Sequence, residues 1–325
     1  MISEPLDILG MTFDDVVQRL APAPKTVAAL RSRYRLAMTD DTPQSHRANS
    51  ALVTGKQRST VAPDADTGAR RDSHAVFTAD PRPVVRHQRD GELIKFIQNT
   101  ETGVETESVI IPMGQGDRSW HSLCVSSQVG CRMGCTFCET AQLGLVRNLT
   151  AAEIVGQVVA ARRTFGIRVK KIVFMGMGEP FDNFDEVIQA VRVLTDPYGL
   201  SMSKRQITIS TVGRIAGIRR LAELGWQYLQ LAVSLNAPND EIRSSIMPVN
   251  RTDTMALLRD ALVEYPLRRN MYIMIEYVVI PDVNDSVAHA QELAEYLRPV
   301  KCCVNIIPYN PRRESPWPAP SEESV

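Results

Sequence analysis

Six short hydrophobic runs occur from residue 122 onward, and consecutive runs are separated by enough residues for a helix. The runs are SLCVSS (122–127), KIVFMG (171–176), QITIST (206–211), LQLAVSLN (229–236), YIMIEYVVI (272–280) and CVNIIPYN (303–310). Helical patterns lie between them: one opens at Thr150, with Glu153 at capping-box spacing, and others cover about 184–195, 214–225, 252–264 and 286–297. Wholly apolar strands that alternate with helices favour a parallel sheet covered by helices. The pattern therefore predicts the α/β class and a partial (β/α)6 barrel, with functional residues at the carboxyl ends of its strands.

The residues before these runs form three segments that differ in composition and pattern. Residues 1–38 carry apolar positions at helical spacing and predict a short helical N-terminal region. Residues 39–89 are rich in Ser, Thr, Asp and Pro without periodicity, which predicts a disordered linker. Residues 90–121 contain two alternating segments around the turn TETG and predict a β-hairpin that leads into the core at 122–325.

Composition narrows the class of protein. The 325 residues are 44% hydrophobic and 23% charged, as in ordinary globular enzymes, and no apolar run is long enough to span a membrane. No targeting segment opens the sequence, so we expect a cytoplasmic protein. We also expect a monomer. Lys plus Arg equals Asp plus Glu at 37 each, so bulk charge does not indicate a nucleic-acid partner. The local basic segments 168–171 and 251–270 are either an RNA-binding surface or plain solvated faces.

Three of the six cysteines, Cys131, Cys135 and Cys138, lie in the stretch GCRMGCTFC. A structural zinc site usually takes four ligands, and the adjacent Cys302 and Cys303 do not complete such a set. A disulfide framework is not expected in a chain without a secretory segment. Three thiolates at this spacing suit a [4Fe-4S] cluster in which the protein holds three irons. The fourth iron is then open for chemistry.

The Cys-x3-Cys-x2-Cys spacing, with Phe137 before the last cysteine, resembles the signature of radical S-adenosylmethionine (SAM) enzymes. Further stretches resemble the adenine-2 methyltransferases of large-subunit ribosomal RNA (rRNA) and transfer RNA (tRNA). They are RNLTAAEIVGQV, FMGMGEPFDNFDEV, VSLNAPNDEIRSSIMPVNR, EYVVIPDVNDS and VNIIPYNP, and the resemblance covers about 107–318. Related adenine-8 methyltransferases share much of this pattern. The resemblance implies a radical SAM barrel, a [4Fe-4S] cluster, SAM, an RNA substrate and an electron donor such as flavodoxin or ferredoxin.

By this resemblance, polar groups at the strand ends bind SAM. Glu179, in the turn MGMGEP, is expected to accept a charge-assisted bond from the SAM ammonium. The full expected set is Gly178, Glu179, Ser210, Ser234, Leu235, Asn236 and Asn310. Asn236 stands where the family usually has His. Taken singly, each is also explained as a strand-end residue with a local hydrogen bond.

The resemblance also implies two catalytic residues. Cys124 matches the thiol that releases the methylated base by forming a disulfide, although a lone strand cysteine is more commonly a small buried apolar side chain. Glu107 matches the proton acceptor for the adenine ring, with a solvated strand carboxylate as the alternative.

The last six residues, PSEESV, predict a helix start with Ser321 as N-cap. By the resemblance, a methyl-carrying cysteine is expected beyond Val325. We expect either a chain that continues or a paralogue that cleaves SAM without methyl transfer. A non-catalytic remnant that holds a cluster is the third reading.

Overall fold

The computed structural model describes residues 5–41, 76–114 and 119–325. The chain divides into two compact units. Unit 1 comprises Met1–Leu123, Leu149–Lys170 and Asp185–Ser203, and unit 2 comprises Cys124–Asn148, Lys171–Phe184 and Lys204–Val325. Among the described residues, no helix is long and apolar enough to cross a membrane. The four-part division expected from the sequence remains a prediction.

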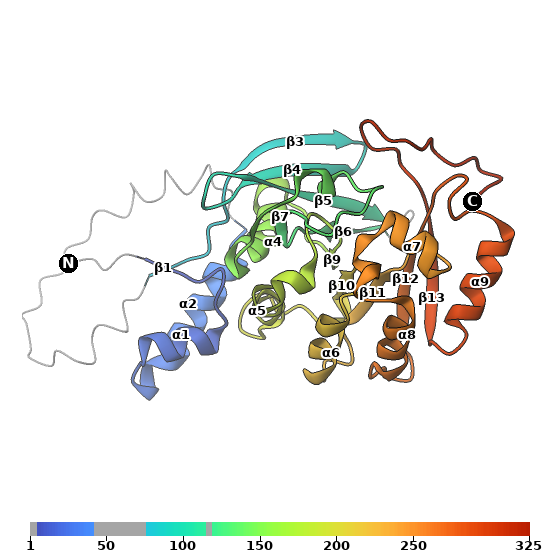
Figure 1. Ribbon diagram of the computed structural model, residues 1–325. Coiled ribbons are helices and arrows are strands. Elements are labelled where there is room, and N and C mark those ends of the chain that lie inside the picture. The colour runs from blue at the N-terminus through green and yellow to red at the C-terminus, as the bar shows by residue number, and fades with distance from the viewer. Residues whose placement is uncertain (1–4, 42–75, 115–118) are drawn as a thin grey trace, which may run out of the picture. The chain divides into compact units, whose positions relative to one another are not determined.

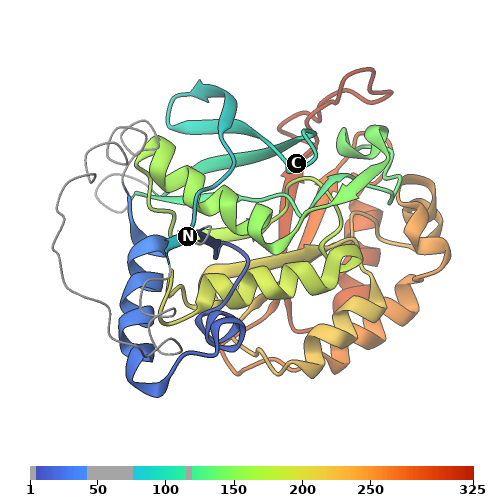
Figure 2. The ribbon, with the colours of Figure 1, turned by 90° about the vertical axis from the view of Figure 1, so that its left-hand side faces the viewer.

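Unit 1 begins with the helices expected before residue 38. They are α1 (Phe13–Leu20) and α2 (Val27–Thr39), separated by the 3-10 turn η1 (Pro24–Thr26). Thr12 starts α1 with a capping box, because its hydroxyl accepts from the Asp15 amide and the Asp15 carboxylate accepts from the Thr12 amide. The two helices, blue in Figures 1 and 2, pack through Phe13 and Tyr34, whose ring centroids lie 5.6 Å apart.

The strands of unit 1 form a small pair and a larger set. β1 (Leu6–Asp7) lies parallel to β2 (Phe77–Thr78). The larger set runs in the order β6 (Trp120–Cys124), β5 (Glu105–Met113), β4 (Leu93–Asn99) and β3 (Val84–Asp90). β4 and β5 are antiparallel and confirm the predicted hairpin. Two helices complete the unit: α4 (Ala151–Phe165), which starts at the predicted Thr150 capping box, and α5 (Phe184–Thr195), whose limits match the prediction.

Part of the linker prediction is wrong. Residues 76–89 carry β2 and most of β3, while residues 42–75 of the predicted linker lie outside the described part of the chain. Every residue of β3 after Val84 is exposed, so the strand has no hydrophobic face that a sequence pattern could reveal. Antiparallel backbone pairing with β4 forms this strand instead.

Unit 2 holds five parallel strands in consecutive order: β9 (Lys171–Phe174), β10 (Ile207–Thr211), β11 (Gln230–Ser234), β12 (Ile273–Val279) and β13 (Cys302–Pro308). Its longer helices are α6 (Ile215–Glu223), α8 (Met255–Glu264) and α9 (Val287–Leu297). With β6, a strand occurs at each of the six predicted places, and the α/β class is confirmed.

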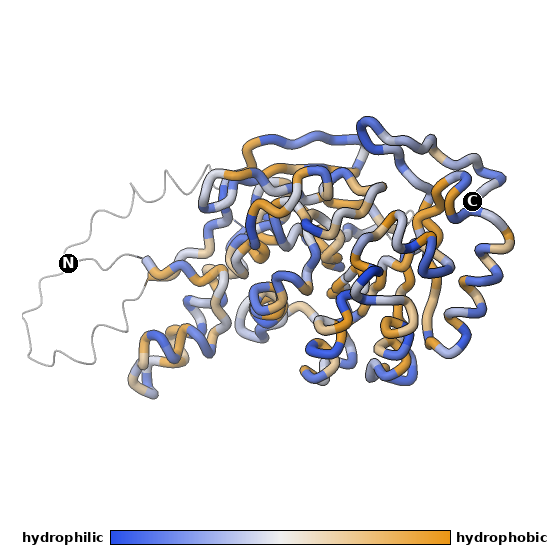
Figure 3. The backbone as a smooth tube through the Cα atoms, viewed as in Figure 1, coloured by the Kyte–Doolittle hydropathy of each residue, from blue (hydrophilic) through white to orange (hydrophobic). Residues whose placement is uncertain are grey.

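The three central strands of unit 2, β10 to β12, are apolar because both faces are covered, whereas β13 has no buried residue. All five residues of β10 are buried, as are most of β11 and β12. Figure 3 shows the contrast with α8 and α9, which carry hydrophilic and hydrophobic residues along the same helix. In Figures 1 and 2, α6 and α8 lie next to each other outside the strands.

Several short elements of unit 2 were not predicted. They are β7 (Gln128–Gly130), η4 (Thr140–Leu143), β8 (Leu145–Asn148), η5 (Pro180–Asn183), η6 (Lys204–Gln206), α7 (Asp240–Ile246) and η7 (Pro248–Arg251). Elements this short give too few positions for a periodic pattern.

The predicted helix start at Ser321 is present only as a turn. The Ser321 hydroxyl accepts from the Ser324 amide at 3.2 Å, as an N-cap would, and its carbonyl accepts from the Val325 amide at 3.3 Å. One hydrogen-bonded turn is a nucleus and not yet a stable helix.

Candidate functional site

Unit 2 contains a cavity of about 280 Å³ at the carboxyl ends of its parallel strands. It is lined by residues that end β9, β10 and β11 and by residues of β12 and β13. Eight of the residues predicted from the sequence line it: Cys131, Cys135, Cys138, Gly178, Glu179, Ser210, Ser234 and Asn236. This is the end of the sheet at which barrel enzymes place their active sites.

The cysteine loop is held by backbone contacts before any cofactor is considered. It lies between β7 and β8, where the Cys131 amide donates to the Gly144 carbonyl at 2.8 Å. A Cβ on Gly130 would lie 1.8 Å from the same carbonyl oxygen, and its φ is +73°, so only glycine fits there. On the other side of the loop, the Thr136 amide donates to the Ile246 carbonyl at 2.9 Å. The loop is therefore tied to two separate parts of unit 2.

The three thiols lie in a largely apolar environment. Cys131 and Cys135 are buried and Cys138 is half-buried, next to Met133, Met247 and other hydrophobic side chains. Burial, with a smaller contribution from the charge of Cys138, raises the pKa of Cys131 to about 11 and that of Cys135 to about 12. Iron binds the thiolate, so cluster formation at these residues releases protons.

The donor set fits an iron–sulfur cluster better than a single ion. In the described parts of the chain, no group of three or more His, Cys, Asp or Glu could hold one metal ion. A [4Fe-4S] cluster does not need such convergence, because each thiolate binds a different iron. Three thiols that line one cavity meet this requirement.

The turn after β9 allows the chain to approach the cysteine segment closely. A Cβ on Gly178 would lie 2.6 Å from Cβ of Gln128, and the φ of Gly178 is +103°. The Gln128 side chain, which is fully buried, accepts from the Glu179 amide at 2.8 Å and donates to Asn148 at 2.8 Å. Gln128 thus connects the turn to the hairpin that carries the cysteines.

Glu179 points its carboxylate to the end of the neighbouring strand. One oxygen accepts from the Phe181 amide at 3.0 Å and the other from the Val212 amide at 2.8 Å. The residue is 1% exposed, and burial raises the pKa of its carboxyl to about 7 despite these bonds. A cation placed in the cavity would offset this desolvation and favour the ionised carboxylate.

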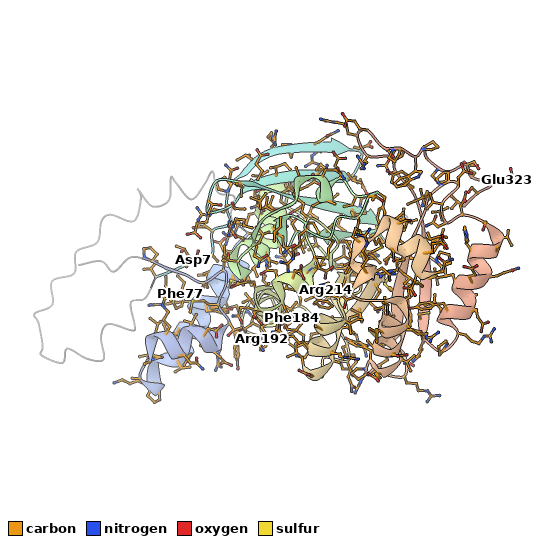
Figure 4. All side chains as sticks on the ribbon, viewed as in Figure 1. Asp7, Phe77, Phe184, Arg192, Arg214 and Glu323 are labelled. Atoms are coloured by element: carbon orange, nitrogen blue, oxygen red, sulfur yellow. The ribbon has the colours of Figure 1, made fainter. Side chains whose placement is uncertain are left out.

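Charged and aromatic contacts fix the segment after Glu179. Asp182 accepts from Arg132 at 2.6 Å and from Arg214 at 3.1 Å, and Arg214 also reaches Asp253 at 2.7 Å. The Arg220 guanidinium lies 3.9 Å from the ring centroid of Phe184. Figure 4 labels Arg214 and Phe184. These contacts hold the segment that follows the Gly-Glu-Pro turn in place.

The strand-end polar residues differ in what they leave available. Ser210 and Ser234 line the cavity with hydroxyl groups at the ends of β10 and β11. Asn236 also lines it, but its side-chain oxygen accepts from the Val278 amide at 2.9 Å and its amide nitrogen donates to the Met247 sulfur. Its φ of 57° is a left-handed conformation, which Asn tolerates better than most residues.

Four predicted residues do not line the cavity. Leu235 is fully buried, and its backbone bonds Glu276 and Arg243. Asn310 is exposed after β13, and Cys124 is half-buried at the end of β6, directly before the pairing of the Val125 amide with the Val173 carbonyl. Glu107 belongs to unit 1, where it pairs with Lys95 at 2.8 Å. Their proposed roles remain predictions.

Sequence reasoning missed three buried residues of this site. They are Gln128, Arg243 and Glu276. The fully buried Arg243 donates to the Leu235 carbonyl at 3.1 Å and to Asn250 at 2.9 Å, which fixes the segment after β11. Glu276 lines the cavity, and one carboxylate oxygen accepts from Asn305 at 2.6 Å. A charged residue inside an apolar strand was the available signal for Glu276.

The comparisons with known proteins agree with this geometry. The family model described as the radical SAM superfamily matches residues 125–296. A relative from Protochlamydia amoebophila, "Probable dual-specificity RNA methyltransferase RlmN 1", is 42% identical over 75% of this chain and 67% of its own length. "Dual-specificity RNA methyltransferase RlmN" from Nitratidesulfovibrio vulgaris is 42% identical over 98% of this chain and 85% of its own. The chain belongs to the RlmN family of the radical SAM superfamily.

A solved structure supports the RlmN-family fold. The crystal structure of a radical SAM methyltransferase from Sphaerobacter thermophilus matches with a TM-score of 0.79 and 37% identity, over 98% of this chain and 90% of that one. The expected family and radical SAM fold are thus confirmed. Membership in the RlmN family implies a [4Fe-4S] cluster and SAM as cofactors. It favours neither the paralogue without methyl transfer nor the non-catalytic remnant.

Proposed function

We propose that this RlmN-family protein is a radical SAM enzyme that methylates carbon 2 of adenine in large-subunit rRNA and tRNA. The relatives are named dual-specificity RNA methyltransferases, which supports an RNA substrate. The observation that carries the proposal is the meeting of Cys131, Cys135, Cys138 and Glu179 in one cavity at the carboxyl ends of the strands.

The chain's own residues have separable roles in this cavity. The three cysteines would hold three irons of the cluster, which would supply one-electron chemistry to bound SAM. Glu179 accepts from the SAM ammonium, which pairs a desolvated carboxylate with a cation. Ser210 and Ser234 offer hydroxyl groups to the polar atoms of SAM. The apolar wall around the cysteines excludes water from the reactive species.

Two residues outside the cavity wall complete the proposal. Cys124 is the thiol that attacks the sulfur of the methyl-carrying cysteine that the family resemblance implies; the new S–S bond forms as the bond from that sulfur to the base breaks, and its electron pair leaves with the methylated base. Glu107 accepts a proton from the adenine ring. We further propose a monomer that works in the cytoplasm with a small electron-transfer protein, such as flavodoxin or ferredoxin, as its reductant.

Mass spectrometry of digested RNA tests the proposed product. The gene is expressed in a host that lacks its own adenine-2 methyltransferase, and rRNA and tRNA are digested to nucleosides. We expect 2-methyladenosine in both RNAs. Finding 8-methyladenosine instead would move the enzyme to the related adenine-8 class, and unmodified adenine in both RNAs would contradict the proposal.

A variant pair tests the role of Cys124. Cys124→Ala should leave a covalent protein–RNA adduct, because the base can be attached but not released. The matched control is Cys303→Ala, since Cys303 is exposed on β13 and is not assigned a role. Free product from Cys124→Ala at the wild-type rate would remove Cys124 from the mechanism.

A further inference from the structure

Basic residues gather at the amino ends of the parallel strands of unit 2. They begin β9, lie within the five residues before β10 and β12, or directly precede β13, and they are Lys171, Lys204, Arg205, Arg268, Arg269 and Lys301. The amino ends of parallel strands lie at the same end of the sheet, so these residues lie at one end of it. We call this end of the sheet, with its basic residues, the basic edge. It is opposite the carboxyl ends that form the cysteine cavity.

A cavity of about 340 Å³ lies at the basic edge. Its wall is formed by Arg205, Gln230, Arg268, Arg269, Asn270 and Met271. Three guanidinium-bearing residues and two amide side chains therefore surround it, and no carboxylate is among these lining residues of the described chain. The sequence carries no net charge, so this concentration of positive charge is not a by-product of a basic protein.

Aromatic rings hold the cations of the basic edge in place. The guanidinium carbons of Arg205 and Arg268 lie 4.3 Å and 4.2 Å from the ring centroid of Tyr228. The Lys204 ammonium lies 4.9 Å from the ring centroid of Trp226. Stacking on Tyr228 uses the face of the Arg268 guanidinium, and the N–H edge of such a group is the part that pairs with an anion.

The loop before β12 is tied down at this edge as well. The Lys301 ammonium donates to the backbone carbonyl oxygens of Arg268 at 3.2 Å and Arg269 at 2.6 Å. The backbone that presents these two arginines is therefore positioned before a ligand binds. A preorganised loop loses less conformational entropy on binding.

The chemistry of the basic edge matches phosphate. Arginine forks bind phosphate oxygens through paired N–H groups. The Asn270 amide can add a neutral donor, whereas the Gln230 amide nitrogen already donates to the carbonyls of Leu231 and Tyr272. Basic residues interleaved with aromatic rings are also the composition of nucleic-acid-binding surfaces. The segment 251–270, whose last residues include Arg268 and Arg269, was one of the two basic stretches in the sequence that could form such a surface.

We infer that the basic edge is a second RNA-binding surface, which holds backbone phosphates of the substrate away from the reacting base. The inference rests on the proposed function, because it takes RNA as the substrate. An acidic electron donor is the competing partner, but it has to approach the cluster at the other ends of the strands. β11 has five residues and β12 has seven, which corresponds to about 17–23 Å. About five to seven base pairs of duplex span that length.

Salt-dependent binding of an unmodified tRNA transcript tests the inference. The variants are Arg269→Gln and the double variant Arg268→Gln/Arg269→Gln in the reconstituted protein. The control is Arg219→Gln, an equally exposed arginine on α6. We expect Arg269→Gln to weaken binding about fivefold to eightfold at 0.1 M salt and to lower the slope of log K against log salt by about one. The double variant should lose more, and the control should stay within twofold.

Several results would overturn the inference. They are wild-type affinity and slope in both variants, a change only in the rate of reduction by flavodoxin, or no binding of the transcript by the wild type. SAM cleavage without RNA should be the same in all four proteins. The two proposals fail separately: lost methylation with the expected binding differences contradicts the enzymatic function, whereas normal methylation with unchanged binding contradicts the RNA-binding surface.

Discussion

The polar groups at the two ends of the unit 2 sheet differ in their exposure to solvent. At the carboxyl ends, Glu179 is 1% exposed and Cys135 is 6% exposed. At the amino ends, Arg268 and Arg269 are exposed to solvent. Burial makes charge costly but strengthens each electrostatic contact, which suits reactive groups. Exposed cations attract a polyanion over a longer range without that cost. The same strands thus support chemistry at one end and RNA affinity at the other.

The strongest way to break this comparison is to remove a cluster thiol. Cys135→Ala should reduce iron from about four per chain to nearly none and abolish SAM cleavage, because three thiolates are the minimum set. RNA affinity should stay within about twofold, since the amino ends are untouched. Cys303→Ala serves as the control. Iron content equal to wild type in Cys135→Ala would remove this residue from the cluster.

Alanine substitutions at two glycines compare the two ends of the sheet by their effect on the free energy of unfolding. Gly178→Ala adds a clash with Gln128 to a left-handed backbone, whereas Gly225→Ala, just after the carboxyl end of α6, meets nothing within 4 Å. Both changes should cost about 1–2 kcal/mol of backbone strain. Gly178→Ala should cost about 1–3 kcal/mol more in free energy of unfolding through overpacking. Equal losses in urea unfolding would show that the turn can move away from Gln128.

Replacing one carboxylate oxygen of Glu179 by an NH₂ group tests the proposed SAM-binding site. Glu179→Gln removes the charged acceptor and places an NH₂ group opposite the amide of Phe181 or Val212. We expect SAM affinity to fall by roughly 1.5–3 kcal/mol, or about 10-fold to 150-fold, in anaerobic calorimetry. The exposed Glu241→Gln on α7 should not change it. Unchanged affinity in Glu179→Gln would place the ammonium elsewhere.

The smallest effect is expected at the basic edge. Lys301→Ala removes one charge and the two bonds that position the loop at Arg268 and Arg269. RNA affinity should fall about twofold to fivefold, while SAM affinity stays the same. If SAM affinity fell and RNA affinity did not, the basic edge would support the cavity and not RNA binding.

Sequence patterns predicted elements wherever burial follows a regular period. The limits of α5 matched the prediction because its buried positions recur at helical spacing, and the α4 start was marked by Thr150 and Glu153. β3 was missed because its side chains are exposed and only backbone pairing forms it. A polar pattern therefore does not distinguish a solvated strand from a linker.

The site was predicted in part for a similar reason. Cysteine spacing and the Gly-Glu-Pro turn are local signals, and the structure places them in one cavity. Gln128 and Arg243 act through contacts between segments that are distant in sequence, such as Gln128 with Glu179. No local spacing reports such contacts. Leu235 and Asn310 neighbour polar strand ends but do not line the cavity.

The central claim is that the carboxyl-end cavity holds the cluster and SAM together. Anaerobically reconstituted protein with about four irons per chain is reduced with dithionite in the presence of SAM, and 5′-deoxyadenosine is measured by mass spectrometry. The account predicts 5′-deoxyadenosine from the wild type and from Cys303→Ala, and none from Cys135→Ala. Fully loaded and reduced wild-type protein that leaves SAM intact would contradict it.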